Sequence, residues 1–496
     1  MGDQTGFSAT SLSRRTALTF GAGAAGLAAM QGSATAQTQS QAASRPADSS
    51  ASVDVVVVGA GFAGLTAARA LRAAGHSVVV LEADDRVGGR TKPGKIAGET
   101  VDLGGQWVGP AQARLLALAK EYGVAVYPQF TAGKNILDVA GRRVTYEGET
   151  PGLSPMALVE LALVIGKFEA LARKVPASRP WEAPDAEAND AQTMETWVLA
   201  NAKSPAVRTV MRLAVRTLAC AEASEISLLA MLAAASSAGG LNEMISTRGG
   251  AQDSMLRGGV WQLAARMAEE LGSALVLSAP VTAIRQHESG VTVQAGERQW
   301  RARYVVVTAP PSMAARIDYQ PPLPAMRDGL TQRMPMGCVI KVHIAYERPF
   351  WRTQGLTGNV LSDRSEFGPW FDHSPEHGST GGLVGFFAGR AAQRWAERSS
   401  DARREQVLKD VAVYLGDEAL KPVDFLEEVW TAAKWHRGGY GATPGLGVLT
   451  GFGPALREPV GRIYWAGTET AEAFAGYIDG AIRSGEHSAQ EVARRL

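Results

Sequence analysis

The segment from Asp54 to Glu82 limits what this chain can fold into more than any other part of the sequence. Asp54–Val58 is a short β-branched run of the kind that forms a buried parallel strand. Thr66–Ala74 carries small and apolar residues at helical spacing, and Ser77–Leu81 is a second apolar run. Strand, helix and strand in this order make a βαβ unit, so we predict an α/β fold built on a parallel, Rossmann-type sheet.

A glycine-rich turn joins the first strand to the helix. Gly59 permits the tight turn, Gly61 lets the backbone approach a pyrophosphate, and Gly64 lets helix and strand pack closely. Glu82, at the end of the second strand, can accept hydrogen bonds from ribose hydroxyls. The same GxGxxG spacing recurs at residues 21–26 without a preceding strand, so the context predicts a dinucleotide only at Gly59. A glycine-rich turn that binds nothing is the alternative.

The first 36 residues have the pattern of an export signal. Arg14 and Arg15 precede an Ala/Gly-rich apolar stretch, and Ala34–Ala36 offers a small-residue cleavage site. A twin-arginine leader cut after about Ala36 predicts a periplasmic or secreted protein, and a tail with a chance arginine pair is the alternative. No later segment sustains the roughly 18 apolar residues of a membrane helix, so we expect no membrane anchor.

The composition gives no support for a nucleic-acid-binding protein or for a metal-dependent enzyme. The chain has 496 residues, with 50 Lys and Arg against 49 Asp and Glu, and this balance gives no reason to expect a nucleic-acid partner. Its two cysteines and seven scattered histidines lack the spacing of metal ligands. We therefore do not expect a metal-dependent mechanism.

Two further glycine motifs follow the βαβ unit, Gly88–Thr91 (GGRT) and Asp102–Pro110 (DLGGQWVGP). Together the three motifs resemble the FAD-binding half of the flavin monoamine oxidase family, and the order of motifs holds from about Val53 to the C-terminus. The resemblance implies an α/β fold, α+β overall, in which a discontinuous Rossmann-type FAD-binding domain carries a helical and antiparallel-sheet substrate domain. The expected parts are a leader (1–36), a linker (37–52), the FAD domain (53–129, 258–309, 429–496) and the substrate domain (helical 130–257, sheet 310–428). Within the helical part, apolar residues at three- and four-residue spacing predict four helices, over Ala157–Lys174, Thr193–Ala202, Ala206–Ala219 and Ser227–Ala238.

The resemblance also assigns the cofactor contacts. It implies that Glu82 binds the adenosine ribose, that Arg90 contacts the pyrophosphate, and that Val281 touches the adenine through its backbone. The flavin ring and its ribityl chain would lie along backbone and side chains of Gly104, Gly105, Trp435, Thr468, Glu469, Tyr477 and Ile478. A helix that begins near Tyr477 would stabilise negative charge on the reduced ring, and a C-terminal helix that only packs on the sheet is the alternative.

Three residues are candidates for catalysis. Lys341 lies on an alternating strand and taken alone reads as a solvated lysine, but the family has a lysine here that holds a water beside flavin N5. Tyr440 and Tyr477 lie in glycine-rich loops that usually carry packing residues, yet in the family two such tyrosines sandwich the amine. By the same resemblance, the substrate cavity includes Gln106, Ile245 and Gln252. Gly439 stands where members with covalent flavin have cysteine, so we expect non-covalent FAD.

Because only one dinucleotide site is expected, the electrons should come from the substrate rather than from NADPH. We therefore predict oxidation of a small amine to an imine, which water converts to an aldehyde or ketone, with dioxygen or an electron carrier taking the electrons. An L-amino-acid oxidase is the first alternative and would need a cavity arginine, for which Arg248 and Arg437 are candidates. A flavin electron carrier without its own substrate and a carbon–carbon desaturase are two others. A homodimer is left open.

Overall fold

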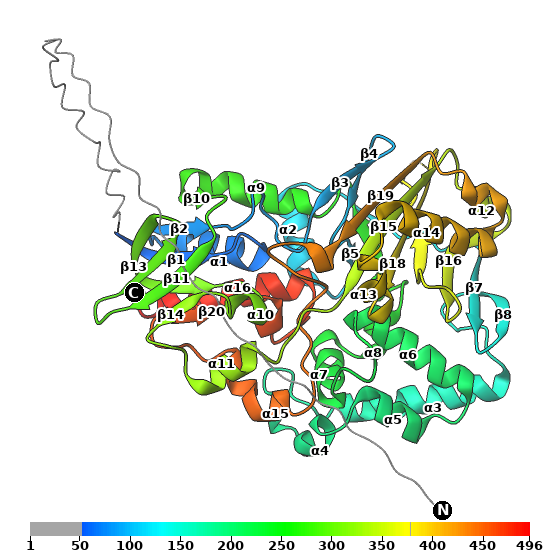
Figure 1. Cartoon of the computed structure of the whole chain (residues 1–496), viewed down its shortest axis with the longest axis horizontal. Helices are drawn as coiled ribbons and strands as arrows, with labels where there is room; N and C mark the ends of the chain where they lie inside the picture. Colours follow the sequence, from blue (N-terminus) through cyan, green and yellow to red (C-terminus); the bar gives the residue numbers. More distant parts are fainter. Residues whose placement is uncertain (1–51, 377) are drawn as a thin grey trace, which may run out of the picture. The chain divides into compact units, whose positions relative to one another are not determined.

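The computed structural model of the chain describes residues 52–376 and 378–496, and the predicted leader and the predicted linker up to residue 51 lie outside this range. An eight-stranded sheet carries the predicted βαβ unit, in the order β10-β2-β1-β13-β12-β11-β14, with β20 paired to β13 (Figure 1). β1 (Ser52–Val58) pairs in parallel with β2 (Val78–Leu81) and with β13 (Arg298–Val307). β20 (Ile463–Trp465) joins β13 in parallel. The Rossmann-type parallel sheet is confirmed.

Strands from the middle of the chain complete this sheet. They are β10 (Leu275–Val276), β11 (Val281–Gln286), β12 (Val291–Ala295) and β14 (Asp318–Gln320). β14 pairs with β11, so the sheet continues past residue 309. Three residues are too few to produce a sequence pattern, which is why β14 was not expected.

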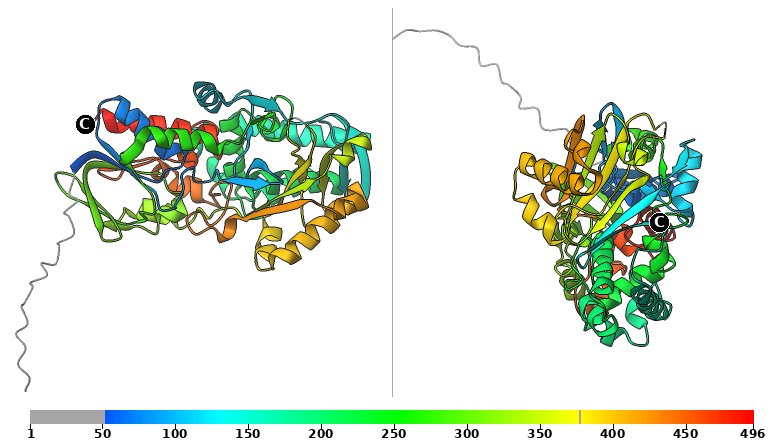
Figure 2. Two further views of the ribbon diagram at one scale, coloured as in Figure 1. Left: turned by 90° about the horizontal axis from the view of Figure 1, so that it is seen from above. Right: turned by 90° about the vertical axis from the view of Figure 1, so that its right-hand side faces the viewer.

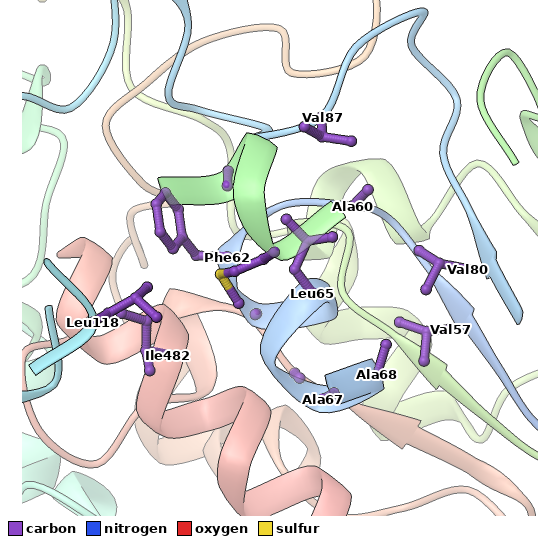
Figure 3. Packing of buried hydrophobic residues seen from close by; sticks show 14 of the residues in the cluster. Val57, Ala60, Phe62, Leu65, Ala67, Ala68, Val80, Val87, Leu118 and Ile482 are labelled. Atoms are coloured by element: carbon purple, nitrogen blue, oxygen red, sulfur yellow. The ribbon is translucent and has the colours of Figure 1, made fainter. Parts of the chain in front are cut away.

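The first helix, α1 (Phe62–Ala73), begins directly after Gly61 and packs against α16 (Ile478–Ala493) from the other end of the chain. Figure 2 shows the blue and red segments side by side. Leu65 and Ala68 of α1 meet Val57 and Val80 of the neighbouring strands in a buried apolar cluster (Figure 3). Small residues allow this contact, since a Cβ added to Gly485 of α16 would lie 2.3 Å from the carbonyl oxygen of Ala63. The turn that carries the dinucleotide motif is therefore clamped between the sheet and α16.

A second sheet of seven strands has the order β19-β15-β18-β17-β16-β7-β8. β15 (Val339–Tyr346), second from one edge, pairs antiparallel with β18 (Gly381–Ala388) and with the edge strand β19 (Asp424–Val429). Ile340, Val342 and Ile344 point into an apolar cluster beneath α14 (Ser400–Leu415). The predicted alternation therefore holds, and Lys341 and His343 point to the opposite face, toward β4 (Glu99–Asp102).

The block from residue 130 to 257 contains the four expected helices and one hairpin that was not expected. The helices are α3 (Pro155–Ala172), α5 (Met194–Asn201), α6 (Pro205–Ala219) and α7 (Leu228–Ala238). The hairpin, β7 (Lys134–Val139) and β8 (Arg142–Glu147), adds to the edge of the antiparallel sheet through a parallel pairing of β7 with β16 (Leu356–Ser362). In the described part of the chain, no helix has the length and apolar character to cross a membrane.

Gly64 tests the close packing of α1 on the dinucleotide turn. A Cβ at this position would lie 2.0 Å from the carbonyl oxygen of Gly59, so we expect Gly64→Ala to destabilise the protein by about 1–3 kcal/mol. Gly166, on the exposed face of α3, has no atom within 4 Å of an added Cβ, so Gly166→Ala should stabilise by about 0.5–1 kcal/mol. Thermal unfolding of both variants measures the difference, and equal melting temperatures would contradict the packing.

Candidate active site

One cavity of about 710 Å³ extends from the dinucleotide turn to the antiparallel sheet. It brings together nearly all the residues that the sequence singled out from distant segments. Those that line it are Gly59, Gly61, Glu82, Arg90, Gly104, Gly105, Gln106, Gln252, Val281, Lys341, Trp435, Tyr440, Thr468, Glu469, Tyr477 and Ile478.

Two of the expected residues do not line this cavity. Gly64 faces the carbonyl of Gly59, so it acts through the packing of helix on strand and not through contact with a ligand. Ile245 is 41% exposed, and its neighbour Met244 forms the cavity wall instead. Both lie on the short helix α8 (Leu241–Ile245), where successive side chains point to different sides. The placement of Ile245 in the wall is therefore corrected.

The dinucleotide end has free backbone amides beside a buried carboxylate. Helix α1 begins at Gly61 without a side-chain cap, and Phe62 and Ala63 of its first turn line the cavity. The first amides of a helix have no partner within the helix, so they are available to phosphate oxygens. Glu82 accepts bonds from the amides of Ala60 (2.5 Å) and Asp84 (2.8 Å). Burial raises the pKa of Glu82, although these two bonds oppose the shift.

The opposite end of the cavity contains a second uncapped helix start. Helix α16 begins after Tyr477, and no side chain caps it. Asp479 in its first turn is turned away, because its Oδ1 accepts from the amides of Arg114 (2.6 Å) and Leu115 (2.9 Å) at the start of α2 (Ala113–Glu121). The positive end of α16 is therefore not neutralised from within its own first turn. Tyr477 and Ile478 line the cavity at this point, which suits a ring that gains negative charge.

A backbone strap, residues 102–106, passes between the two sheets. Lys341 Nζ donates to the carbonyl oxygens of Asp102 (2.6 Å) and Gly104 (2.8 Å), and to Gln106 Oε1. The ring of His343 contacts the same Asp102 oxygen at 3.0 Å, and Trp430 Nε1 donates to Leu103 O at 2.8 Å. Side chains of the antiparallel sheet and of the segment directly after β19 thus hold the strap where the flavin is expected.

Two buried charged groups, Lys341 and Asp102, lie at the strap. Burial lowers the pKa of Lys341, and the nearby Asp102 carboxylate opposes that shift. Burial likewise raises the pKa of Asp102, whose two oxygens each accept from the amide of Val260 at 3.0 Å. Three oxygen acceptors favour the ammonium form of Lys341 and use its three N–H groups. The contacts therefore support a role in fixing the strap, and the water beside flavin N5 stays a prediction.

Arg90 has protein partners that the sequence did not indicate. Its guanidinium pairs with both oxygens of Glu469 (2.6 and 3.0 Å) and donates to the carbonyl oxygen of Tyr440 at 2.8 Å. Arg86, which the sequence analysis passed over, donates to the carbonyls of Gly89 (3.0 Å) and Thr91 (2.9 Å) and so braces the GGRT loop. Neither contact leaves a signal in the sequence, because each arginine binds backbone or a distant residue.

Aromatic rings surround the substrate end. Tyr440 and Tyr477 both line the cavity, and the Phe386 ring meets the Tyr440 ring edge-on, with centroids 6.0 Å apart. Trp107 meets Phe371 in the same manner at 5.6 Å. Sequence reasoning missed Phe371 and Phe386, because they lie on separate strands, β17 (Trp370–Asp372) and β18, that only the folded sheet brings together.

The cavity lacks a thiol that could bind the flavin covalently. Cys220 and Cys338 are the two cysteines of the chain, and neither lines the cavity. Gly439 precedes Tyr440, as the sequence showed.

The family model described as "Flavin containing amine oxidoreductase" matches residues 62–493. The chain belongs to this family. It is 39% identical over 444 residues to the putative flavin-containing monoamine oxidase AofH of Mycobacterium tuberculosis, covering 90% of this chain and 97% of that protein. It is 37% identical to an L-amino acid dehydrogenase of Synechocystis, with 89% and 95% covered. A solved structure of putrescine oxidase bound to putrescine is 34% identical, with a TM-score of 0.86 and 90% and 99% covered.

This flavin-containing amine oxidoreductase uses FAD, and its residues fit that cofactor. The cavity has an acceptor for the ribose at Glu82, open helix amides for the phosphates and for the ring, and glycine backbone along the strap. A Cβ on Gly104 would lie 2.0 Å from the carbonyl oxygen of Arg90, so the strap reaches its position only with glycine there. Bound flavin supplies an acceptor for the two electrons that leave the carbon–nitrogen bond.

Lys341→Met tests the role of this lysine in holding the strap. The change leaves the Gly104 carbonyl and the Gln106 oxygen without a donor and leaves the Asp102 carbonyl with His343 alone, so we expect a loss of about 1–3 kcal/mol in stability. Lys95→Met, on the exposed edge of β3 (Pro93–Ile96), should change stability by no more than about 0.5 kcal/mol. Thermal unfolding measures both, and a Lys341→Met protein as stable as the control would show that the strap does not depend on these bonds.

Proposed function

We propose that this enzyme oxidises apolar amines that carry a single positive charge and no second charged group. The observation behind this proposal is the composition of the cavity wall beside Tyr440 and Tyr477. Apart from Gln106 and Gln252, that wall is largely apolar and aromatic. Its members include Trp107, Leu218, Ile226, Ala230, Met231, Ala234, Met244, Val339, Phe371 and Phe386.

A diamine would bring a second ammonium group into this wall. Glu82 and Glu469 are the two carboxylates that line the cavity in the described part of the chain. Glu82 is bound by backbone amides at the dinucleotide turn, and Glu469 is paired with Arg90. A second ammonium buried here would have no free counter-ion among the described residues that line the cavity, which is costly in a low-dielectric site. The wall therefore favours monoamines over putrescine-like substrates.

An amino acid would bring a carboxylate that needs a cation. The two candidates from the sequence, Arg248 and Arg437, do not line the cavity, and Arg248 Nε donates to Thr131 Oγ1 at 2.9 Å. Arg457 does line it, but donates to the carbonyls of Thr470 (2.7 Å) and Ala471 (2.9 Å). Arg316 also lines the cavity, and its neighbour Ile317 packs in the apolar cluster that includes Val281, at the dinucleotide end. These placements favour an amine over its α-carboxylated analogue.

The protein residues have distinct tasks in the reaction. The electron-rich faces of the Tyr440 and Tyr477 rings attract the amine nitrogen, and the apolar wall excludes water while the amine is bound. Hydrogen bonds from Lys341 fix the strap and with it the place of the ring. The open amides of α16 stabilise the negative charge that two-electron reduction brings. The product is an imine, which water hydrolyses to an aldehyde or ketone, and dioxygen or an electron carrier takes the electrons.

A matched substrate series tests the proposal. The three compounds are an n-alkylamine, the α,ω-diamine of the same length, and the α-carboxylated form of the first, each added anaerobically and then in turnover. We expect kcat/KM for the monoamine to exceed the other two values by on the order of 100-fold. Discrimination of this size is typical when a charged or polar group of the poorer substrate finds no partner in the site. Faster turnover of the diamine or the amino acid would refute the substrate class, and no bleaching by any amine would favour an electron carrier.

We also propose that the protein is exported through the twin-arginine route, with cleavage after about Ala36. Support comes from Arg14, Arg15 and the apolar stretch after them, all outside the described residues. Replacing both arginines with lysine should leave the protein in the cytoplasmic fraction, whereas Arg45→Lys in the linker should not change its location. Cell fractionation with immunodetection decides, and unchanged export of the double variant would remove this proposal.

A further inference from the structure

Four hydrogen bonds to backbone atoms hold residues 439–442, the loop that carries Tyr440. Two come from the segment before β15: the amide of Gly439 donates to Gly337 O (2.9 Å), and the amide of Gly337 donates to Gly441 O (3.1 Å). The other two come from the flavin side. Arg90 Nη1 donates to the carbonyl oxygen of Tyr440 at 2.8 Å, and the amide of Ala442 donates to Glu469 Oε1 at 3.1 Å.

Arg90 and Glu469 are also bound to each other in the fork geometry that makes such pairs strong and directional. Their side chains are 22% and 4% exposed. Burial works to raise the pKa of Glu469, but the charge and hydrogen bonds of Arg90 and the amide of Ala442 outweigh it and lower that pKa. The carboxylate is therefore ionised at neutral pH, and one oxygen serves Arg90 and Ala442 together.

We propose that Arg90 and Glu469 are a positioning pair for Tyr440, so that the two loops that line the flavin end of the cavity also set the amine cage. This inference rests on the proposed role of Tyr440 in holding the amine. Arg90 comes from the GGRT loop and binds the carbonyl oxygen of Tyr440 itself, and Glu469 comes from η6 (Thr468–Thr470) and binds the amide of Ala442, two residues further along. Tyr440 lines the cavity and its side chain is hydrogen-bonded to Cys220, so Arg90 and Glu469 act on the backbone from which the ring extends.

A double-mutant cycle with Tyr440→Ala tests the kinetic part. Arg90→Lys keeps the charge but loses the fork, and Glu469→Gln keeps an acceptor oxygen but loses the charge. Each should lower kcat/KM for the preferred amine by about 10- to 100-fold, since small misplacements in an active site cost that much. The FAD content of each purified variant is measured first, and kcat/KM is expressed per bound flavin, because the resemblance also places Arg90 and Glu469 at the cofactor. Glu486→Gln, in the surface pair with Arg114, is the matched control and should change nothing.

In the Tyr440→Ala background the same two substitutions should lower kcat/KM by less than about threefold, because the tyrosine side chain through which they act on the amine is absent. Effects that multiply would show that the pair acts on the flavin directly and would overturn the inference. A Tyr440→Ala enzyme that turns over amines normally would instead overturn the proposed cage.

Hydrogen exchange of the purified FAD enzyme tests the structural part independently of turnover. Glu469→Leu removes the acceptor of the Ala442 amide, so peptides that span residues 439–443 should exchange faster, while peptides from β15 should not change. Unaltered exchange at residues 439–443 would show that Glu469 does not hold this loop, whatever the kinetics of the variants.

Discussion

The three hydrogen bonds of Lys341 join the two halves of this enzyme. The lysine belongs to the antiparallel sheet, and its acceptors belong to the strap that continues the flavin-binding half. A buried ammonium is stable only if oxygen atoms surround it, so strap and strand must stay in register. The part of the substrate wall that strands β17 and β18 supply, Phe371 and Phe386, is thereby fixed relative to the place where the flavin ring is expected.

The N-terminal ends of helices α1 and α16 are the second feature on which the cofactor site depends. α1 and α16 both open into the cavity without side-chain caps, and they pack against each other through small residues. One provides amides at the dinucleotide turn and the other near the Tyr477 end. Because α16 is the last helix and packs against α1, segments from the two ends of the described chain together complete the cofactor site. The charge of Asp479 is directed away, to α2, and this leaves the amides of α16 free for the cofactor.

Local patterns in the sequence were enough to predict the βαβ unit, the four helices of the middle block and the alternation of β15. Each depends on side chains within a few residues of one another. The family resemblance, by contrast, brought Glu82, Lys341, Tyr440 and Tyr477 into one site, and the cavity confirms that they line one space. The hairpin β7–β8 was missed because its partner strand β16 is distant in sequence, and strand pairing of this kind is not a local property.

Interactions between distant residues were likewise beyond the sequence. Arg90 and Glu469 were each expected at the cofactor, but nothing local indicates that they bind each other and the backbone around Tyr440. The wrong placement of Ile245 has the same origin, since one residue along a short helix changes the side to which a chain points. Phe371 and Phe386 could be placed at the cavity only from the pairing of their strands, β17 and β18.

The arrangement of helix starts, strap and cavity places FAD between the start of α16 and the Lys341 strap, without a covalent bond. The most direct measurement is the visible absorption spectrum of the purified protein, followed by denaturation and analysis of what is released. We expect a yellow protein that releases intact FAD into the supernatant. A protein that is colourless and stays so when supplied with FAD would contradict the site, and a flavin that remains attached to the denatured chain would contradict the non-covalent mode.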